Sequence, residues 1–395
     1  MQKSSSILKP SLTLKPIFTL KTIMPLKSAM PLNPNQILNP IMILLLNISS
    51  LSQPCRAQTI TINYFGQKPP TDTAQKFAPG TISKEGRYEL MSAYSSDGKE
   101  FCFTVTNEQW SHFEIWHTLF RNGKWAEPSL IHLPEIRDAF GPAFSPDNQT
   151  LYFTEGNWVT HPSTISYSLR KQDSHKQGSR NQDSSNQDTL NHLPPLNPSD
   201  KTSHPYAGNH PNQIDQSPYW SEPIKLDTTI NPGSDQWQCS VARDGTLLFS
   251  SKRAGGMGNY DLYIAEPDPQ GIRKVSNLHE LNSPADEYSS YIAPDKSYII
   301  FSSQRKGGYG WDDLYISFRQ QENTWTKPLN LGPTINTIHA EFSPQVTPDG
   351  KFLLYSKWDA GNKWSHIYWV RIDKIIAQLK KQATTSLITK IPETQ

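Results

Sequence analysis

Acidic residues recur at one place in a repeated pattern, eight or nine residues before an aspartate that marks a turn. Carboxylates in such number could bind a cation, or work in pairs as general acid and general base. A catalytic pair needs two unlike environments, and five similar residues do not provide them. We expect each carboxylate instead to accept backbone N–H groups, and the set to surround the mouth of a central channel. This acidic ring comprises Glu89, Asp138, Asp235, Glu287 (next to Asp286) and Glu341.

Aromatic and basic residues gather in loops on the same side of the repeated pattern. Flat rings beside cations offer a large contact area and directed polar groups, which suit the binding of a peptide or a sugar. In the alternative, the rings cover the ends of strands and the arginines pair with the acidic ring. The candidate ligand-binding residues are Trp110, Trp158, Arg253, Arg305, Tyr309, Trp311 and Trp364.

Other kinds of chemistry find no support in the sequence. The 38 basic and 36 acidic residues leave a net charge of +2, so no surface for nucleic acid is expected. No Gly-x-Ser-x-Gly nucleophile motif occurs, and the histidines lack the spacing of metal ligands. The glycine-rich segment Gly255–Gly258 fits a turn between strands rather than a phosphate loop, because no helix follows it. We therefore expect no catalytic residue, no metal and no cofactor.

Five copies of a turn followed by an apolar strand position these residues. The turn aspartate stands at positions 97, 147, 244, 295 and 349. An apolar strand such as Leu247–Ser250 follows it, a third strand such as Asp261–Ile264 comes after a loop, and a fourth begins near a Trp-x-x-Pro pattern. Four antiparallel strands about every 50 residues are typical of one blade of a β-propeller. The sequence predicts an all-β fold with five blades.

One gap between turn aspartates is about twice the others, and it would allow a sixth blade as the alternative. Residues 171–216 fill this gap, but they are polar and contain no strand-like run. We interpret them as a disordered insertion in the second blade. The fifth copy lacks a fourth strand of its own. We expect the N-terminal segment Gln75–Gly80 to close the last blade, and residues 374–395 to form a short helix and a tail.

Residues 1–57 are interpreted as a signal peptide and flexible leader. The apolar run Ile41–Leu46 follows basic residues, and Cys55–Ala57 has the small-x-small pattern expected before cleavage at Gln58. Pro54 fits lipoprotein processing poorly, so we do not expect Cys55 to carry a lipid. The leader predicts an exported protein, periplasmic or secreted, that touches the membrane only if this segment stays uncleaved. The propeller is then expected to span residues 58–373.

Three further motifs recur in order in the third and fourth copies. They are a Ser-Ser-x-Arg tetrapeptide, a Gly-Gly-x-Gly loop and an Asp-Leu-Tyr strand, found at 250–253, 255–258 and 261–263 and again at 302–305, 307–310 and 313–315. With these motifs the chain resembles the WD40-like repeats of PD40-type β-propellers, a family related to the propeller of the periplasmic protein TolB. The resemblance covers residues 59–373. It implies a propeller fold, export and a role in binding or scaffolding.

We therefore expect a non-catalytic exported β-propeller that binds a protein or a glycan of the cell envelope through its loops, with no nucleic-acid partner. The alternative is an exported glycan hydrolase or lyase, as some five-bladed propellers are. It would need two carboxylates at catalytic separation, for which Asp235 and Glu341 are the obvious pair. A channel filled by side chains favours the binding protein. An open pocket with a carboxylate whose pKa is raised by burial favours the enzyme.

Overall fold

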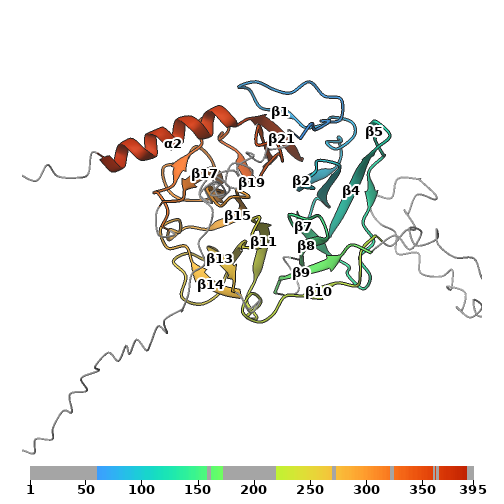
Figure 1. Cartoon of the computed structure of the whole chain (residues 1–395), viewed down its shortest axis with the longest axis horizontal. Helices are drawn as coiled ribbons and strands as arrows, with labels where there is room; N and C mark the ends of the chain where they lie inside the picture. Colours follow the sequence, from blue (N-terminus) through green and yellow to red (C-terminus); the bar gives the residue numbers. More distant parts are fainter. Residues whose placement is uncertain are drawn as a thin grey trace, which may run out of the picture. The chain divides into compact units, whose positions relative to one another are not determined.

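The structure is a computed structural model that describes residues 60–157, 162–171, 219–268, 273–320, 324–358, 361 and 364–388. These residues form five antiparallel sheets, the blades, arranged around a common centre (Figure 1). Each blade runs outward from an inner strand, and neighbouring strands are hydrogen-bonded. The predicted five-bladed propeller is confirmed, and the described residues contain no sixth blade.

The first two blades hold the strands β2 to β10. Blade 1 consists of β2 (Tyr88–Tyr94), β3 (Glu100–Thr106), β4 (Phe113–Arg121), β5 (Lys124–Trp125) and β6 (Ser129–Leu130), the last two both paired with β4. Blade 2 consists of β7 (Ala139–Phe144), β8 (Thr150–Glu155), β9 (Thr164–Leu169) and β10 (Ile224–Lys225). Residues 171–216, predicted to be an insertion, come between β9 and β10 in the sequence, and all of them beyond Lys171 lie outside the described residues.

The other three blades complete the ring. Blade 3 consists of β11 (Gln236–Val241), β12 (Leu247–Ser251), β13 (Asp261–Pro267) and β14 (Arg273–Asn277). Blade 4 consists of β15 (Glu287–Ile292), β16 (Tyr298–Ser303), β17 (Asp313–Phe318) and β18 (Leu329–Asn330). Blade 5 consists of β19 (Ala340–Val346), β20 (Phe352–Trp358), β21 (Ser365–Arg371) and the N-terminal β1 (Gln75–Lys76). The inner strands β2, β7, β11, β15 and β19 each contact the next one around the ring, and β19 contacts β2 (Figure 1).

The turn aspartate forms the same turn in all five blades. Its carboxylate accepts the backbone N–H two residues ahead, as from Asp97 to Lys99 at 3.1 Å and from Asp244 to Thr246 at 3.0 Å. The residue directly after the aspartate has left-handed backbone each time, with φ between +59° and +83°. Glycine or asparagine adopts this conformation at least cost, and such a residue stands there in four of the five blades. Local turn chemistry therefore explains the repeated pattern.

The N-terminal strand closes blade 5, as predicted. In β1, Gln75 pairs with Trp369 and Lys76 pairs with Tyr368, both in β21. The next residue, Phe77, donates its backbone N–H to the carbonyl of Ile367 in β21, and its side chain is fully buried. The last blade is therefore completed by a strand from the N-terminal segment, which closes the ring.

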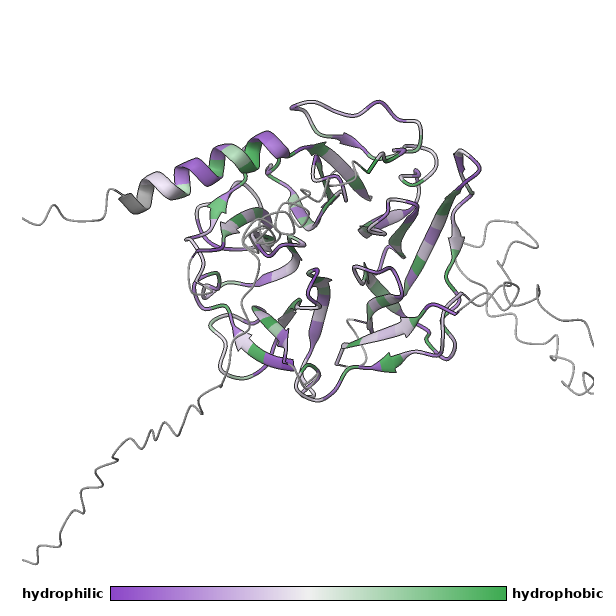
Figure 2. Cartoon of the chain, in the orientation of Figure 1, coloured by the Kyte–Doolittle hydropathy of each residue, from purple (hydrophilic) through white to green (hydrophobic). Residues whose placement is uncertain are grey.

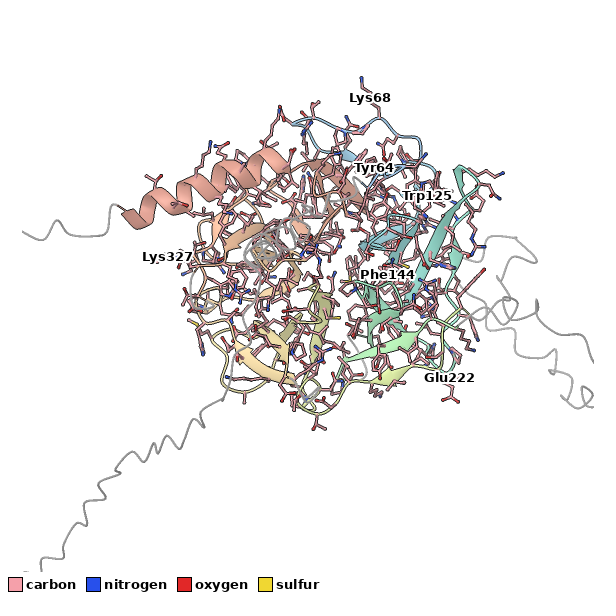
Figure 3. All side chains as sticks on the ribbon, viewed as in Figure 1. Tyr64, Lys68, Trp125, Phe144, Glu222 and Lys327 are labelled. Carbon is pink, nitrogen blue, oxygen red and sulfur yellow. The ribbon has the colours of Figure 1, made fainter. Side chains whose placement is uncertain are left out.

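The segment before β1 joins blades 1 and 5. The Tyr64 hydroxyl donates a hydrogen bond of 2.8 Å to Oδ2 of the turn aspartate Asp349 in blade 5. The neighbouring Phe65 stacks on Trp125 of blade 1, with ring centroids 4.3 Å apart. Figure 3 labels Tyr64 and Trp125 at this junction. Aromatic contacts thus reinforce the closure made by the backbone.

A single helix, α2 (Asp373–Ile388), follows β21 directly. Its residues Ile375, Ile376 and Leu379 pack against the apolar cluster that blades 4 and 5 share. Polar and apolar residues alternate along it (Figure 2), as expected for a helix with one face on a core. The predicted helix is confirmed and begins one residue earlier than expected. Among the described residues, no helix has the length and apolar character needed to cross a membrane. The predicted leader, residues 1–57, lies outside the described residues.

Candidate functional site

Each inner strand has a β-bulge at the same place, and the bulges determine which side chains fill the channel. The pairing with the second strand shifts register there in all five blades, and the bulged residue has positive φ: Met91, Gly141, Gln238, Ser289 and Ser343. The residue just before each bulge has a large side chain: Leu90, Phe140, Trp237, Tyr288 and Phe342. All five belong to one apolar cluster, so side chains from every blade occupy the channel at this level.

The predicted acidic ring divides into two sets, because its members occupy two neighbouring positions. Glu89, Glu287 and Glu341 lie eight residues before their turn aspartates, whereas Asp138 and Asp235 lie nine residues before theirs, as Asp286 does. Successive residues of a strand point to opposite sides of its sheet. The two sets therefore have different surroundings.

The three glutamates are fully buried. Glu287 accepts hydrogen bonds from the backbone N–H of Ser283 at 2.7 Å and from Arg305 at 3.2 Å. Glu341 accepts the backbone N–H of Thr337 at 2.9 Å. Burial raises the pKa of both Glu287 and Glu341.

Glu89 of blade 1 accepts a hydrogen bond of 2.8 Å from Nδ1 of His366 in blade 5. The Nε atom of Arg87 lies 2.7 Å from the same carboxylate. Glu89 thus contacts the adjacent blade, whereas Glu287 and Glu341 are bound within their own connectors and blades. A bound molecule cannot reach these three side chains.

The three aspartates instead join neighbouring blades. Each accepts the backbone N–H at the start of the third strand of the preceding blade: Phe113 to Asp138 at 3.0 Å, Ser163 to Asp235 at 2.9 Å and Tyr260 to Asp286 at 3.0 Å. These contacts lie on the side of the ring that carries the loops between the second and third strands, here called the top face. Asp235 keeps 30% of its side chain exposed, so its carboxylate is accessible from solvent.

A hollow of about 700 Å³ lies on the top face between blades 2, 3 and 4. Aromatic side chains from three inner strands and one loop form part of its wall: Phe140, Trp237, Tyr260 and Tyr288. Polar groups also line it, among them Asp235, Lys252, Asn259, Asp286 and Gln304. A concave site with aromatic walls and a few convergent polar groups is typical of ligand-binding pockets.

Lys252 fills part of this hollow. Its Nζ lies 3.3 Å from Oδ2 of Asp235 and 4.6 Å from the centroid of the Tyr260 ring. Burial raises the pKa of the Tyr260 phenol, and Asp235 and Asp286 raise it further, so Tyr260 is a neutral aromatic surface at ordinary pH. The hollow thus already holds one ammonium group between a carboxylate and a ring face.

The two predicted ligand-binding arginines are engaged within the fold. Arg253 donates hydrogen bonds to the backbone carbonyls of Thr229 and Ile230, which lie in the connector that enters its blade. Arg305 donates in the same way to the carbonyl of Leu281 and to Glu287. Each guanidinium also lies over two aromatic rings of its own blade. Their geometry serves to fix the connectors.

The predicted aromatic residues differ widely in exposure. Trp311 is 72% exposed and its ring lies 5.9 Å from that of Trp358, while Tyr309 is about half exposed. Trp110 and Trp364 both pack against Tyr88, with centroids 6.0 Å and 5.1 Å away, and are only partly exposed. Trp158 lies outside the described residues. Among the predicted rings that the structure describes, those of blade 4 are therefore the most accessible.

Several residues of the hollow were not among the sequence candidates. Trp237 and Tyr288 precede bulges, and Asp286 was noted only as a neighbour of Glu287. A signal does exist, since a large residue occupies the same position in every inner strand. Its meaning depends on the bulge, which the sequence does not reveal. The described residues contain no cluster of three or more His, Cys, Asp or Glu side chains able to hold a metal ion.

The fold and the site together define the chain as a five-bladed β-propeller with an aromatic, polar hollow on its top face. No protein-family model matches the sequence, and no curated protein matches it. Solved structures similar to it include TolB from Acinetobacter baumannii, with 13% identity over 72% of this chain and 54% of that one, at a TM-score of 0.38.

A second similar structure is the putative TolB from Agrobacterium tumefaciens, with 12% identity over 69% of this chain and 71% of that one, at a TM-score of 0.40. A third is an alpha-L-arabinofuranosidase from Lactobacillus brevis, with 12% identity over 72% of this chain and 88% of that one, also at 0.40. The chain spans about half the length of the Acinetobacter protein. Likeness at such identity concerns the fold alone.

Proposed function

We propose that this chain is an exported, non-catalytic propeller that binds a protein or a glycan of the cell envelope through its top face. The observation that carries the proposal is the hollow between blades 2, 3 and 4, whose aromatic walls and polar groups are open to solvent. Exposed rings of blade 4, Tyr309 and Trp311, lie in a loop of the same face and extend the available contact surface. Aromatic anchors in a concave surface are typical of recognition sites.

The arrangement of carboxylates argues against catalysis by the pair that the enzyme alternative requires. Glu341 is fully buried and its oxygens are bound by Thr337, so no substrate can touch it. Asp235 is accessible, but it accepts the Ser163 N–H and faces Lys252. General acid–base chemistry on a glycan needs both carboxyl groups at the scissile bond. The side chains that fill the channel likewise favour the binding protein.

Export is part of the proposal and rests on the sequence. The basic stretch, the apolar run Ile41–Leu46 and the cleavage pattern at Cys55–Ala57 together form a signal for secretion. An envelope location would bring the top face into contact with envelope proteins and glycans. Fractionation of cells that express the full chain, with N-terminal sequencing of the product, tests this part directly.

Binding is tested by capture from envelope extract on the immobilised chain, followed by purification of the captured molecule and measurement of its affinity. Trp311→Ala should weaken that affinity about tenfold or more, as truncation of an aromatic anchor does. Ile224→Ala in the outer strand β10 is a matched control, because Ile224 is exposed and lies outside the top face. Equal affinity for both variants, or turnover of an envelope glycan that Asp235→Asn abolishes, would overturn the proposal.

A further inference from the structure

The hollow on the top face has more negative than positive charge. Its wall contains two carboxylates, Asp235 and Asp286, and one ammonium group, Lys252, which leaves a net charge of −1. Lys252 faces Asp235. Asp286 accepts hydrogen bonds from the backbone of Asn259 and Tyr260, and no basic side chain of the described residues forms an ion pair with it. One carboxylate in the hollow is therefore not neutralised.

A third carboxylate lies just behind the wall. Only 7% of the surface of Asp312 is exposed, and its Oδ1 atom has no hydrogen-bond partner among the described residues. Burial raises the pKa of Asp312, and hydrogen bonding to Tyr288 and Gln304, which line the hollow, opposes that rise. Asp312 does not itself line the hollow, so the contacts available to a bound group come from Asp235 and Asp286.

The position of Lys252 shows what the hollow accepts. An ammonium group over the face of Tyr260 and 3.3 Å from Asp235 combines a cation–π contact with an ion pair. The Lys252 side chain keeps 34% of its surface exposed, so a competing cation can displace it into solvent at low cost.

Next to this position the aromatic wall continues without a cation of its own. The Trp237 and Tyr260 rings are 6.0 Å apart, and the Tyr260 and Tyr288 rings are 6.4 Å apart. Asp286 lies within electrostatic range of both tyrosines. Ring faces beside an unpaired carboxylate are the surroundings that lysine and arginine side chains prefer.

We propose that the hollow binds lysine or arginine side chains of a protein partner, with Asp286 and the rings of Tyr260 and Tyr288 as the primary contacts and Lys252 as an internal competitor. The inference rests on the proposed function and selects a basic protein surface over a glycan. The volume of about 700 Å³ exceeds one side chain and admits a short basic segment. The whole chain carries a net charge of only +2, so general attraction does not explain binding of a cationic peptide.

The experiment measures binding of fluorescein-labelled tetralysine to the full-length chain by fluorescence polarisation. Asp286→Asn keeps an acceptor for the two backbone N–H groups but removes the charge, and it should weaken binding about tenfold. Asp138→Asn is the matched control, because Asp138 has the same role between blades 1 and 2 and does not line this hollow. It should leave the affinity unchanged.

Lys252→Met tests whether Lys252 competes with a bound cation or has only a structural role. Removal of the competing ammonium should strengthen tetralysine binding about threefold or more, since it leaves both carboxylates unpaired. A weaker complex would show that Lys252 itself contacts an anionic or polar ligand and would overturn the inference. Tetra-acetyl-lysine should not compete, and competition by a neutral oligosaccharide such as maltotetraose would support the glycan instead.

The two proposals can fail separately. Failure of tetralysine to bind, while capture of an envelope molecule still depends on Trp311, refutes the basic ligand and leaves the binding function standing. If tetralysine does not bind and capture of an envelope molecule does not depend on Trp311, both proposals are refuted. Thermal unfolding of each variant, compared with the unmodified chain, confirms that a change in affinity does not come from unfolding.

Discussion

The backbone N–H of Tyr260, in blade 3, donates a hydrogen bond of 3.0 Å to Oδ1 of Asp286, in blade 4. The same relationship joins blades 1 and 2 through Asp138 and blades 2 and 3 through Asp235. One set of carboxylates therefore both connects the blades and supplies the negative charge of the top face. Stability and recognition are consequently linked at these positions, and the two effects need variants that separate them.

Replacing Asp286 by alanine should destabilise the propeller by about 1–3 kcal/mol, because the N–H groups of Asn259 and Tyr260 lose their acceptor. Asp286→Asn retains an acceptor and should cost less than about 1 kcal/mol. Urea unfolding followed by tryptophan fluorescence measures both. Equal stability of the alanine variant and the unmodified chain would contradict this role.

Gly258→Ala should be strongly destabilising. A Cβ atom at position 258 would overlap the backbone oxygen of Ala285 in the connector to blade 4, so these two segments would have to move apart. Overpacking typically costs about 1–3 kcal/mol, and a rigid backbone neighbour puts this variant at the upper end of that range. Gly123→Asn is the comparison, because asparagine tolerates left-handed backbone and no atom lies within 4 Å of a Cβ at that glycine. A thermal midpoint for Gly258→Ala within a degree of the unmodified value would refute the close approach.

The stability of the junction between blades 1 and 2 should fall at alkaline pH. Hydrogen bonds to Asp138 at 2.8 Å and to Glu114 at 3.2 Å raise the pKa of His112 to about 9. Because folding raises this pKa, protonation of His112 stabilises the folded protein. The stabilisation is complete below the pKa of the unfolded chain, near 6.5, and is lost as the pH rises through about 9.

The expected loss between pH 6.5 and pH 9.5 is about 1 kcal/mol, after allowance for the solvent that reaches this partly exposed pair. Urea midpoints at the two pH values measure it. His112→Gln has no titrating group at this site and should remove that part of the slope. An identical slope in the two proteins would assign the pH effect to other residues.

Phe77→Ala should test the closure of blade 5. Phe77 is fully buried, and its ring lies 5.2 Å from those of Phe101 in blade 1 and Trp369 in blade 5. Truncation of a buried phenylalanine costs about 3–5 kcal/mol. Lys76→Ala, one residue earlier and exposed, should be nearly neutral. If the phenylalanine variant proved as stable as the lysine variant, the N-terminal segment would not be needed to hold the ring together.

The fold was predictable because its repeated signals are local. The turn at Asp97 is fixed by hydrogen bonds within a few residues, and the same turn follows from Asp244 or Asp349. The last copy of the pattern lacks a fourth strand, so another segment had to provide one. Strand β1 (Gln75–Lys76) provides it. These features depend on the order of residues and not on the packing of distant side chains.

The site was predictable only in part, because one residue of offset reverses the direction of a side chain. Glu341 and Asp235 look alike in sequence, yet the first is fully buried and the second faces the hollow. The bulges add a second uncertainty, since they decide that Trp237 reaches the channel. The partners of Arg253 are backbone carbonyls of another loop, which no pattern of residue types encodes.

Blade 5 is assembled from both ends of the described chain. During synthesis, β1 is made first and β21 last, so β1 has no partner strand until four other blades exist. A force applied at either terminus is therefore transmitted to the same sheet, through the short pairing of Gln75 and Lys76 with β21. We expect mechanical unfolding to begin by detaching the segment of Tyr64 and Phe65 and then to peel β1 from β21, after which the ring opens at a single point.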